Sequence, residues 1–161
     1  MEVLRIKTAD KVVFTFKLLK SKAILIGCKE YSEKIIWIPA FVKGRPVTEI
    51  GTGAFTRSKA RKIILPDTTK KICSGAFYCC YNLEKITFRK NLLSIEKTAF
   101  YKCTSLKSIE FSYKSKAIIS ELAFYDCPIV DVKMPRKTYK FIETNVFDEL
   151  VKDLLTGRKK L

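Results

Sequence analysis

The stretch that decides the fold reads Ile72-Cys73-Ser74-Gly75-Ala76-Phe77-Tyr78-Cys79-Cys80-Tyr81-Asn82-Leu83-Glu84-Lys85-Ile86-Thr87-Phe88. It is one copy of a repeat. Its Ala-Phe pair recurs at a regular spacing in four copies, which end at Phe55, Phe77, Phe100 and Phe124, and once more in the altered form Val146-Phe147. The successive phenylalanines are 22, 23, 24 and 23 residues apart. A fixed period in the low twenties predicts a stack of similar structural units.

Other residue types recur at fixed distances from each phenylalanine. An isoleucine precedes it by five residues, and a small residue, usually cysteine, follows it by three. An apolar triplet of strand character comes next, and its last two members alternate so that both point to one side of a strand. One turn of this length cannot enclose its own apolar face, so stacked turns would bury each column as a ladder of like side chains. The columns are Ile50, Ile72, Ile95, Ile119, Ile142; Ser58, Cys80, Cys103, Cys127; and the triplets ending Ile63-Leu65, Ile86-Phe88, Ile109-Phe111 and Val132-Met134.

The pattern Ile-x-x-x-Ala-Phe-x-x-Cys-x-x-Leu-x-x-Ile, read from Ile72 to Ile86, resembles the BspA-type leucine-rich repeat. The resemblance covers roughly residues 35 to 147. It implies a right-handed solenoid with a strand-lined concave face, and protein-interaction or adhesion roles that are common at microbial surfaces. The chain departs from the pattern where Phe88-Arg89 and Phe111-Ser112 lack the proline that often closes the strand, and where Cys73 and Glu96 replace a glycine.

The length of 161 residues predicts one domain. We expect an N-terminal β cap over residues 1–46, roughly five repeat turns over residues 47–147, and a helical cap over residues 146–161. The N-terminal block lacks the Ala-Phe signature at the repeat spacing and favours strands at 3–8, 11–19, 22–28 and 34–38, with Trp37 packed under the cap.

The period changes near the C-terminus, where Asn145 can cap a helix. Apolar residues then fall at helical spacing, and Gly157 is a plausible stop. Two capped ends favour a monomer. An amphipathic membrane helix is the alternative, although the basic residues lie beyond the apolar face and do not flank it. The apolar positions are Val146, Phe147, Leu150, Val151, Leu154 and Leu155.

The formal net charge is +16, from 32 basic and 16 acidic residues, and the excess is spread along the chain. A dispersed charge argues against a single basic arm. No apolar run is long enough to span a bilayer. Charged residues interrupt the first eleven positions, so no secretory signal is recognised there. The cytosol is therefore favoured, with the cell surface or secretion as the alternative if a leader has been removed.

Six cysteines raise the question of metal or disulfide chemistry. Cys80, Cys103 and Cys127 share one repeat column, which favours small buried thiols in a reducing compartment. Paired C-x-x-C spacing and histidine are both absent, so no metal site or cofactor is predicted. The absence of histidine also removes the usual general base, and no phosphate-binding glycine motif occurs, so the sequence does not favour an enzyme.

Two surfaces follow from the register of the repeats. The strand residues that flank the central apolar position should line the concave face, which we predict to bind a protein partner. The basic residues of the turns should stack into a ridge that could bind a polyanion such as nucleic acid or an anionic surface. The predicted concave-face residues are Arg61, Lys62, Lys85, Thr87, Arg89, Ser108, Glu110, Asp131 and Lys133. The predicted ridge residues are Lys70, Lys71, Lys90, Lys114, Lys116, Arg136 and Lys137.

Protein binding through the concave face is the favoured function, as a non-enzymatic interaction or adhesion module. Polyanion binding is the alternative, although the aromatic residues occupy core columns and do not alternate with basic ones as in single-strand readers. A third interpretation gives the lysines only the role of keeping an apolar-rich solenoid soluble.

Overall fold

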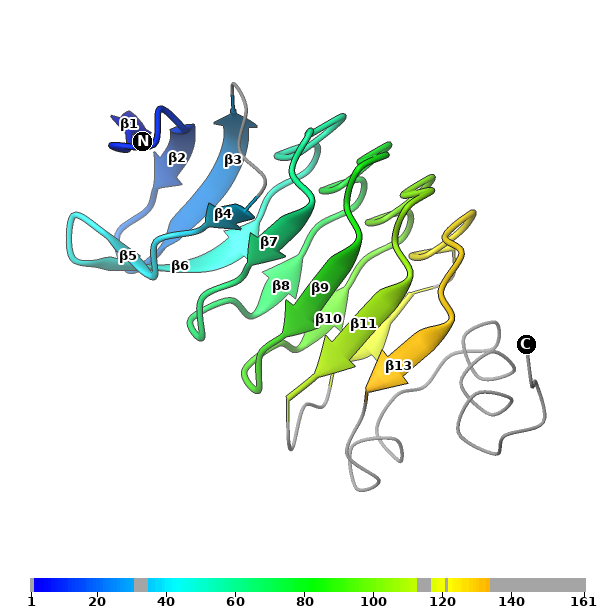
Figure 1. Cartoon of the computed structure of the whole chain (residues 1–161). Helices are drawn as coiled ribbons and strands as arrows, with labels where there is room; N and C mark the ends of the chain where they lie inside the picture. Colours follow the sequence, from blue (N-terminus) through cyan, green and yellow to red (C-terminus); the bar gives the residue numbers. More distant parts are fainter. Residues whose placement is uncertain (1, 31–34, 113–116, 121, 134–161) are drawn as a thin grey trace.

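The computed structural model describes residues 2–30, 35–112, 117–120 and 122–133 (Figure 1). In these ranges the chain forms strands joined by turns, and no helix. The helical cap predicted for residues 146–161 lies outside the described residues. The strands are β1 (Glu2–Lys7), β2 (Val13–Leu18), β3 (Ala23–Lys29), β4 (Ile35–Trp37), β5 (Phe41–Val42), β6 (Arg45–Ile50), β7 (Lys62–Ile64), β8 (Lys71–Ile72), β9 (Lys85–Phe88), β10 (Ser94–Ile95), β11 (Ser108–Phe111), β12 (Ile118–Ile119) and β13 (Asp131–Lys133).

The strands build two sheets that run the length of a β-solenoid of about four turns. Sheet A has the order β1-β2-β3-β6-β8-β10-β12, with β5 paired to β6 outside that order. Sheet B has the order β13-β11-β9-β7-β4, and all its pairs are parallel. Each repeat turn gives one strand to sheet B and one strand to sheet A (Figure 1), and the sheet A strands β8, β10 and β12 have two residues each. The sequence predicts roughly five turns, and the described residues supply about four.

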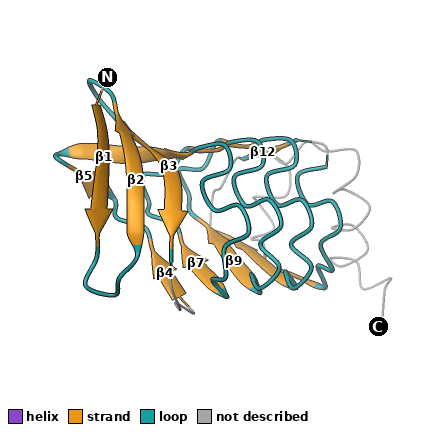
Figure 2. Ribbon diagram, turned by 90° about the horizontal axis from the view of Figure 1, so that it is seen from above, coloured by secondary structure: helices purple, strands orange, loops and turns teal. Residues whose placement is uncertain are grey.

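The N-terminal strands close one end of the stack. β1, β2 and β3 pair antiparallel, and β3 then joins the parallel ladder through β6. These three strands correspond to the strands predicted at 3–8, 11–19 and 22–28. Phe14, Phe16 and Leu25 are buried beneath them, so the cap covers apolar side chains that the first turn would otherwise expose to water. Figure 2 shows this cap at one end, with the loops of successive turns side by side along one side of the solenoid.

β4 lies in the segment predicted as the cap, yet it pairs in parallel with β7. Residues 35–37 are therefore the first strand of sheet B. Of this strand, Ile36 is buried, whereas Trp37 is 68% exposed. The prediction that Trp37 packs under the cap is wrong, because alternation along a strand sends the neighbours of a buried residue to the opposite face.

The phenylalanines of the repeat form a ladder through the core. Ring centroids of Phe55 and Phe77 are 5.1 Å apart, those of Phe77 and Phe100 are 4.7 Å apart, and those of Phe100 and Phe124 are 4.9 Å apart, all with nearly parallel planes. Backbone hydrogen bonds also link adjacent turns beside these rings, since the amide of Phe77 donates to the carbonyl of Ala99 at 2.7 Å. Each ring is therefore covered by its equivalents in adjacent turns, as the repeat predicts.

The cysteine column is a second ladder. The thiols of Cys80, Cys103 and Cys127 donate to the carbonyls of the phenylalanines of the preceding turns at 2.9, 3.1 and 3.0 Å. Cys80 and Cys103 are buried, and all six cysteines are free thiols. The neighbouring thiols of Cys127 and Cys80, together with burial, raise the pKa of Cys103. These thiols therefore hold adjacent turns together through hydrogen bonds.

A left-handed backbone conformation recurs two residues before each phenylalanine. Gly53 and Gly75 take φ values of +66° and +61°, and Thr98 and Leu122 take +58° and +56° at the same level of the next turns. Glycine adopts this conformation without steric cost, whereas a side chain with a Cβ does not. The left-handed conformation is therefore retained at this repeat position in the stacked turns even where the residue is not glycine.

We expect Gly75→Ala to destabilise the protein by about 1 kcal/mol, because the alanine Cβ is disfavoured at positive φ although it would meet nothing closer than 3.9 Å. Gly27→Ala is the matched control: its Cβ would lie 3.6 Å from the Cβ of Thr15, and no left-handed conformation is imposed there. Urea unfolding of both variants measures the difference. Equal free energies of unfolding for the two variants would contradict the prediction.

Candidate functional site

The outward side chains of sheet B form two columns, which we call the strand-lined face. The first column is Ile35, Lys62, Lys85, Ser108 and Asp131, and the second is Trp37, Ile64, Thr87, Glu110 and Lys133. The residues between the two columns point inward and, from Ile36 through Ile109, are buried. The structure therefore brings Lys62, Lys85, Thr87, Ser108, Glu110, Asp131 and Lys133 onto one surface in the order expected from the repeat.

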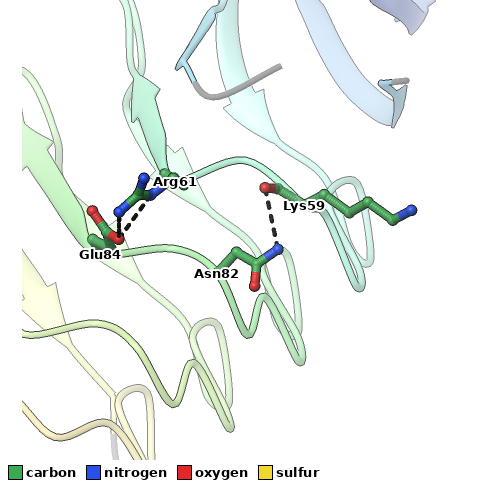
Figure 3. Close-up of polar contacts among 4 residues, drawn as sticks. All are labelled: Lys59, Arg61, Asn82 and Glu84. Carbon is green, nitrogen blue, oxygen red and sulfur yellow. Dashed lines mark hydrogen bonds and ion pairs between the residues drawn. The ribbon is translucent and has the colours of Figure 1, made fainter. Parts of the chain in front are cut away.

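The carboxylates of this surface are paired. Lys85 lies 2.9 Å from Glu110 across the β9–β11 pair, and the hydroxyl of Ser108 donates to Asp131 at 2.8 Å. The ammonium of Lys85 lowers the pKa of the Glu110 carboxyl. At the edge of the face, Nε of Arg61 donates to Glu84 at 2.8 Å, and Asn82 donates to the carbonyl of Lys59 at 3.4 Å (Figure 3).

The cations of the surface differ in whether they have a partner. Arg61 and Lys85 are bound to carboxylates, and Arg89 donates to the carbonyl of Leu65 at 3.2 Å and lies 3.7 Å from Asp67. In the part of the chain that the structure describes, the side chains of Lys62 and Lys133 have no hydrogen bond or ion pair. The face is therefore nearly neutral over β9 and β11, and it keeps a free positive charge at β7.

The N-terminal end of the strand-lined face is apolar. Trp37 is 68% exposed and Ile35 is 46% exposed, and the half-buried Ile64 lies beside Trp37 in the register. Sequence reasoning missed Trp37 and Ile35 as surface residues. The signal was present, since Ile36-x-Ile38 repeats the inward alternation of Ile63-x-Leu65.

The predicted basic ridge is only partly described, because Lys114, Lys116, Arg136 and Lys137 lie outside the described residues. Lys71 pairs in register with Glu49 and Ser94, and its ammonium lies 2.6 Å from Glu96. The next turn places Leu93 beside Lys70, since the amide of Leu93 donates to the Lys70 carbonyl at 2.8 Å. The three described members of the ridge therefore occupy different positions within the repeat and do not stack as a column of cations. They are Lys70, Lys71 and Lys90.

A depression of about 420 Å³ lies on the outer side of sheet A. Lys22, Lys70 and Lys71 contribute to its wall, together with Glu49. Lys22 is bound to Glu49, and Lys71 is bound to Glu96. Two of the three ammonium groups are thus already compensated, which leaves Lys70 as the unpaired cation of this hollow.

A third surface was not predicted. Tyr78, Tyr101 and Tyr125 follow the core phenylalanines and stack outside them, with ring centroids 5.1 and 5.3 Å apart. The Lys102 ammonium lies 5.5 Å from the centroid of Tyr101. Recurrence of tyrosine directly after phenylalanine was the available signal. Because the rings cover one another, their faces are largely occupied and mainly their edges remain exposed.

Two negative findings apply to the described ranges alone. Within them, no group of three or more histidine, cysteine, aspartate or glutamate residues is arranged to hold a metal ion. In those same residues, no helix has the length and apolar character needed to cross a membrane.

Comparison with known proteins identifies the repeat. The model of a family described as "BspA type Leucine rich repeat region" matches residues 31–152 in six copies. No curated protein matches the chain.

Solved structures share the architecture. A leucine-rich repeat protein from Bacteroides capillosus is 25% identical with a TM-score of 0.70, and the match covers 81% of this chain and 98% of that one. A leucine-rich repeat protein from Bacteroides ovatus is 24% identical with a TM-score of 0.62, over 76% of this chain and 40% of that one. The leucine-rich repeat protein of T. pallidum is 21% identical with a TM-score of 0.55, over 88% and 92%.

We expect the pKa of Glu110 to rise in Lys85→Met, because the variant removes the ammonium that favours the charged carboxylate. A folded-state pKa below the unfolded value contributes stability above the unfolded pKa, and that contribution is lost as the pH falls through the folded pKa. Since both side chains are more than a third exposed, the contribution is at most about 1 kcal/mol. Carboxyl chemical shifts followed from pH 7 to pH 2 measure it, with Lys62→Met as the control that should leave Glu110 unchanged.

Trp37 is the one tryptophan of the sequence, so its fluorescence reports on this position alone. We expect the long-wavelength emission of a hydrated indole and quenching by acrylamide close to that of free N-acetyltryptophanamide. Trp37→Ala should change the free energy of unfolding by less than about 0.5 kcal/mol. Ile36→Ala, which empties a buried site one residue away, should cost about 2–5 kcal/mol. A shielded indole would refute the exposed position.

Proposed function

Because the chain belongs to the BspA-type leucine-rich repeat family, we propose that it is a non-enzymatic interaction module that binds a protein partner through the strand-lined face. Proteins with this repeat are generally protein-interaction or adhesion modules. The observation that carries the proposal is the strand-lined face itself. Ten outward side chains stand in two columns across five parallel strands, in a register that the buried columns beneath them hold fixed.

The chemistry of the face supports a macromolecular partner. Its side chains are exposed or half-buried on an extended sheet, whereas small ligands prefer a concave pocket that surrounds them. The ion pair between Lys85 and Glu110 is already formed, and Asp131 accepts a hydrogen bond from Ser108, so a partner that covers β9 and β11 need not bury Lys85 or Glu110 without its counter-ion. An extended surface and an internally compensated ion pair both favour a protein as the partner.

Polyanion binding is the second candidate. The net charge of +16 and the exposed lysines Lys70 and Lys90 support it. The pairing of Lys71 with Glu96 and of Lys22 with Glu49 counts against a dense cationic site, because those ammonium groups are already compensated. The same experiment can separate the two candidates.

We expect Lys62→Glu/Lys133→Glu on the strand-lined face to abolish retention of a discrete protein from a lysate of the organism that encodes the chain. Lys70→Glu/Lys90→Glu is the matched control, since it makes the same charge change at exposed, unpaired lysines away from this face. A protein contact should survive a high-salt wash, whereas polyanion binding falls steeply with salt. Affinity capture on immobilised protein, washed at low and at high salt, is the measurement.

The proposal fails if the bound material is nucleic acid or another polyanion that salt releases and that the control variant loses first. It also fails if both double variants retain the same protein as the unmodified chain, since the strand-lined face would then have no part in the contact.

A further inference from the structure

Trp37 and Ile35 are large apolar side chains that the fold leaves exposed. Both side chains stand on the solvent side of β4, and their exposed fractions are 68% and 46%. A large aromatic side chain left in water forgoes the free energy of burial, and exposed tryptophans are enriched at the centres of protein interfaces. Half-buried Ile64 on the neighbouring strand extends the same apolar surface.

β4 is also the terminal strand of sheet B, as its place beside β7 in Figure 1 shows. The amide of Ile38 donates to the carbonyl of Ile64. In a parallel ladder alternate residues bond to the same neighbour, so Ile36 and Ile38 turn their main-chain groups to β7 and Trp37 turns its own away. Among the hydrogen bonds that the described residues form outside the strand ladders, none satisfies the main chain of Ile35 or Trp37.

The charge next to this edge is positive and uncompensated. Lys62 is the register partner of Ile35 and has no ion pair with any described residue. The carboxylates Glu84, Glu110 and Asp131 farther along the surface are already bound by Arg61, Lys85 and Ser108. A ligand carboxylate near β4 would therefore meet the unpaired ammonium of Lys62, while the Glu30 carboxylate already accepts from the amide of Lys59, three residues before Lys62, at 2.6 Å.

We propose that the free edge of β4 receives an extended segment of the partner protein, which adds to sheet B as a further strand. The main chain of the segment bonds to that of Ile35 and Trp37. Its outward side chains are apolar where they lie against Trp37 and acidic where they approach Lys62. Main-chain pairing supplies affinity in this mode, and alternate side chains supply specificity. The inference rests on the proposed function and narrows it to one end of the strand-lined face.

A second copy of the chain is the other occupant to consider. Its own β4 offers Ile35, Ile36 and Trp37 and no carboxylate, and each copy carries a net charge of +16. Charge complementarity therefore favours an acidic segment of a different protein.

The test is a selection from a display library of random ten-residue peptides on the intact chain. We expect the enriched peptides to alternate apolar residues with aspartate or glutamate and to move the Trp37 emission to shorter wavelength. Trp37→Ala should weaken them tenfold or more, and Lys62→Glu should weaken them and favour basic peptides. Leu93→Ala, which truncates a 57%-exposed leucine away from this edge, is the control and should leave affinity unchanged.

Amide hydrogen exchange separates strand addition from side-chain contact alone. The Trp37 amide should exchange rapidly in the free chain and slowly in the peptide complex. Enriched peptides that leave this amide unprotected, or that bind Trp37→Ala as tightly as the unmodified chain, overturn the inference. So does a selection that enriches no peptide. Self-association that Trp37→Ala abolishes would assign the edge to a second copy and overturn it too.

The two proposals can fail separately. If a captured protein partner is lost in Lys62→Glu/Lys133→Glu but retained in Trp37→Ala, the strand-lined face binds a protein without using the β4 edge. If neither variant affects capture, the proposed function itself fails.

Discussion

The structure depends on burial that only a neighbouring turn can provide. The apolar side chains of a single turn, such as Ile72, Phe77 and Ile86, form one layer that cannot exclude water from both of its sides by itself. Stacking places each ring against its equivalents, as in the Phe55–Phe77–Phe100–Phe124 ladder with centroid distances of 4.7–5.1 Å. Every other regularity of the molecule follows from this requirement. The thiol-to-carbonyl bonds, the left-handed corners and the outward columns all recur because the rings force the turns into one register.

The fold was predictable from the sequence because its information is repeated. Each column recurs in several copies, so one altered copy does not obscure the pattern. Ala60, for example, stands where the next turn has Leu83 at the start of its apolar triplet. The same redundancy located the outward residues Lys62, Lys85, Ser108 and Asp131 in their order. The caps lack this advantage. Trp37 was misplaced because a large aromatic residue in a short strand is usually buried, and only the pairing of β4 with β7 shows which way it points.

Charge was harder to predict than shape. The sequence shows many lysines in the turns, but their effect depends on which neighbour each one meets. Lys71 is compensated by Glu96 and Lys85 by Glu110 across a turn, whereas Lys62 is left unpaired. The predicted cationic ridge presumed that turns of equal composition also align residue by residue. Lys70 instead lies beside Leu93, because the basic residues of successive turns occupy different positions within the repeat.

The unequal spacing of the phenylalanines has a consequence for how such a chain can change over generations. The 22-, 23- and 24-residue intervals show that the corners absorb an added or deleted residue without disturbing the ladders. A change of one residue inside a strand of sheet B would instead exchange its inward and outward sides. Changes of one residue in length are therefore tolerated in the turns between strands, whereas the ladders can be extended in register only by a whole repeat. Such a gene could lengthen or shorten the strand-lined face one turn at a time while the end that carries Trp37 stays the same.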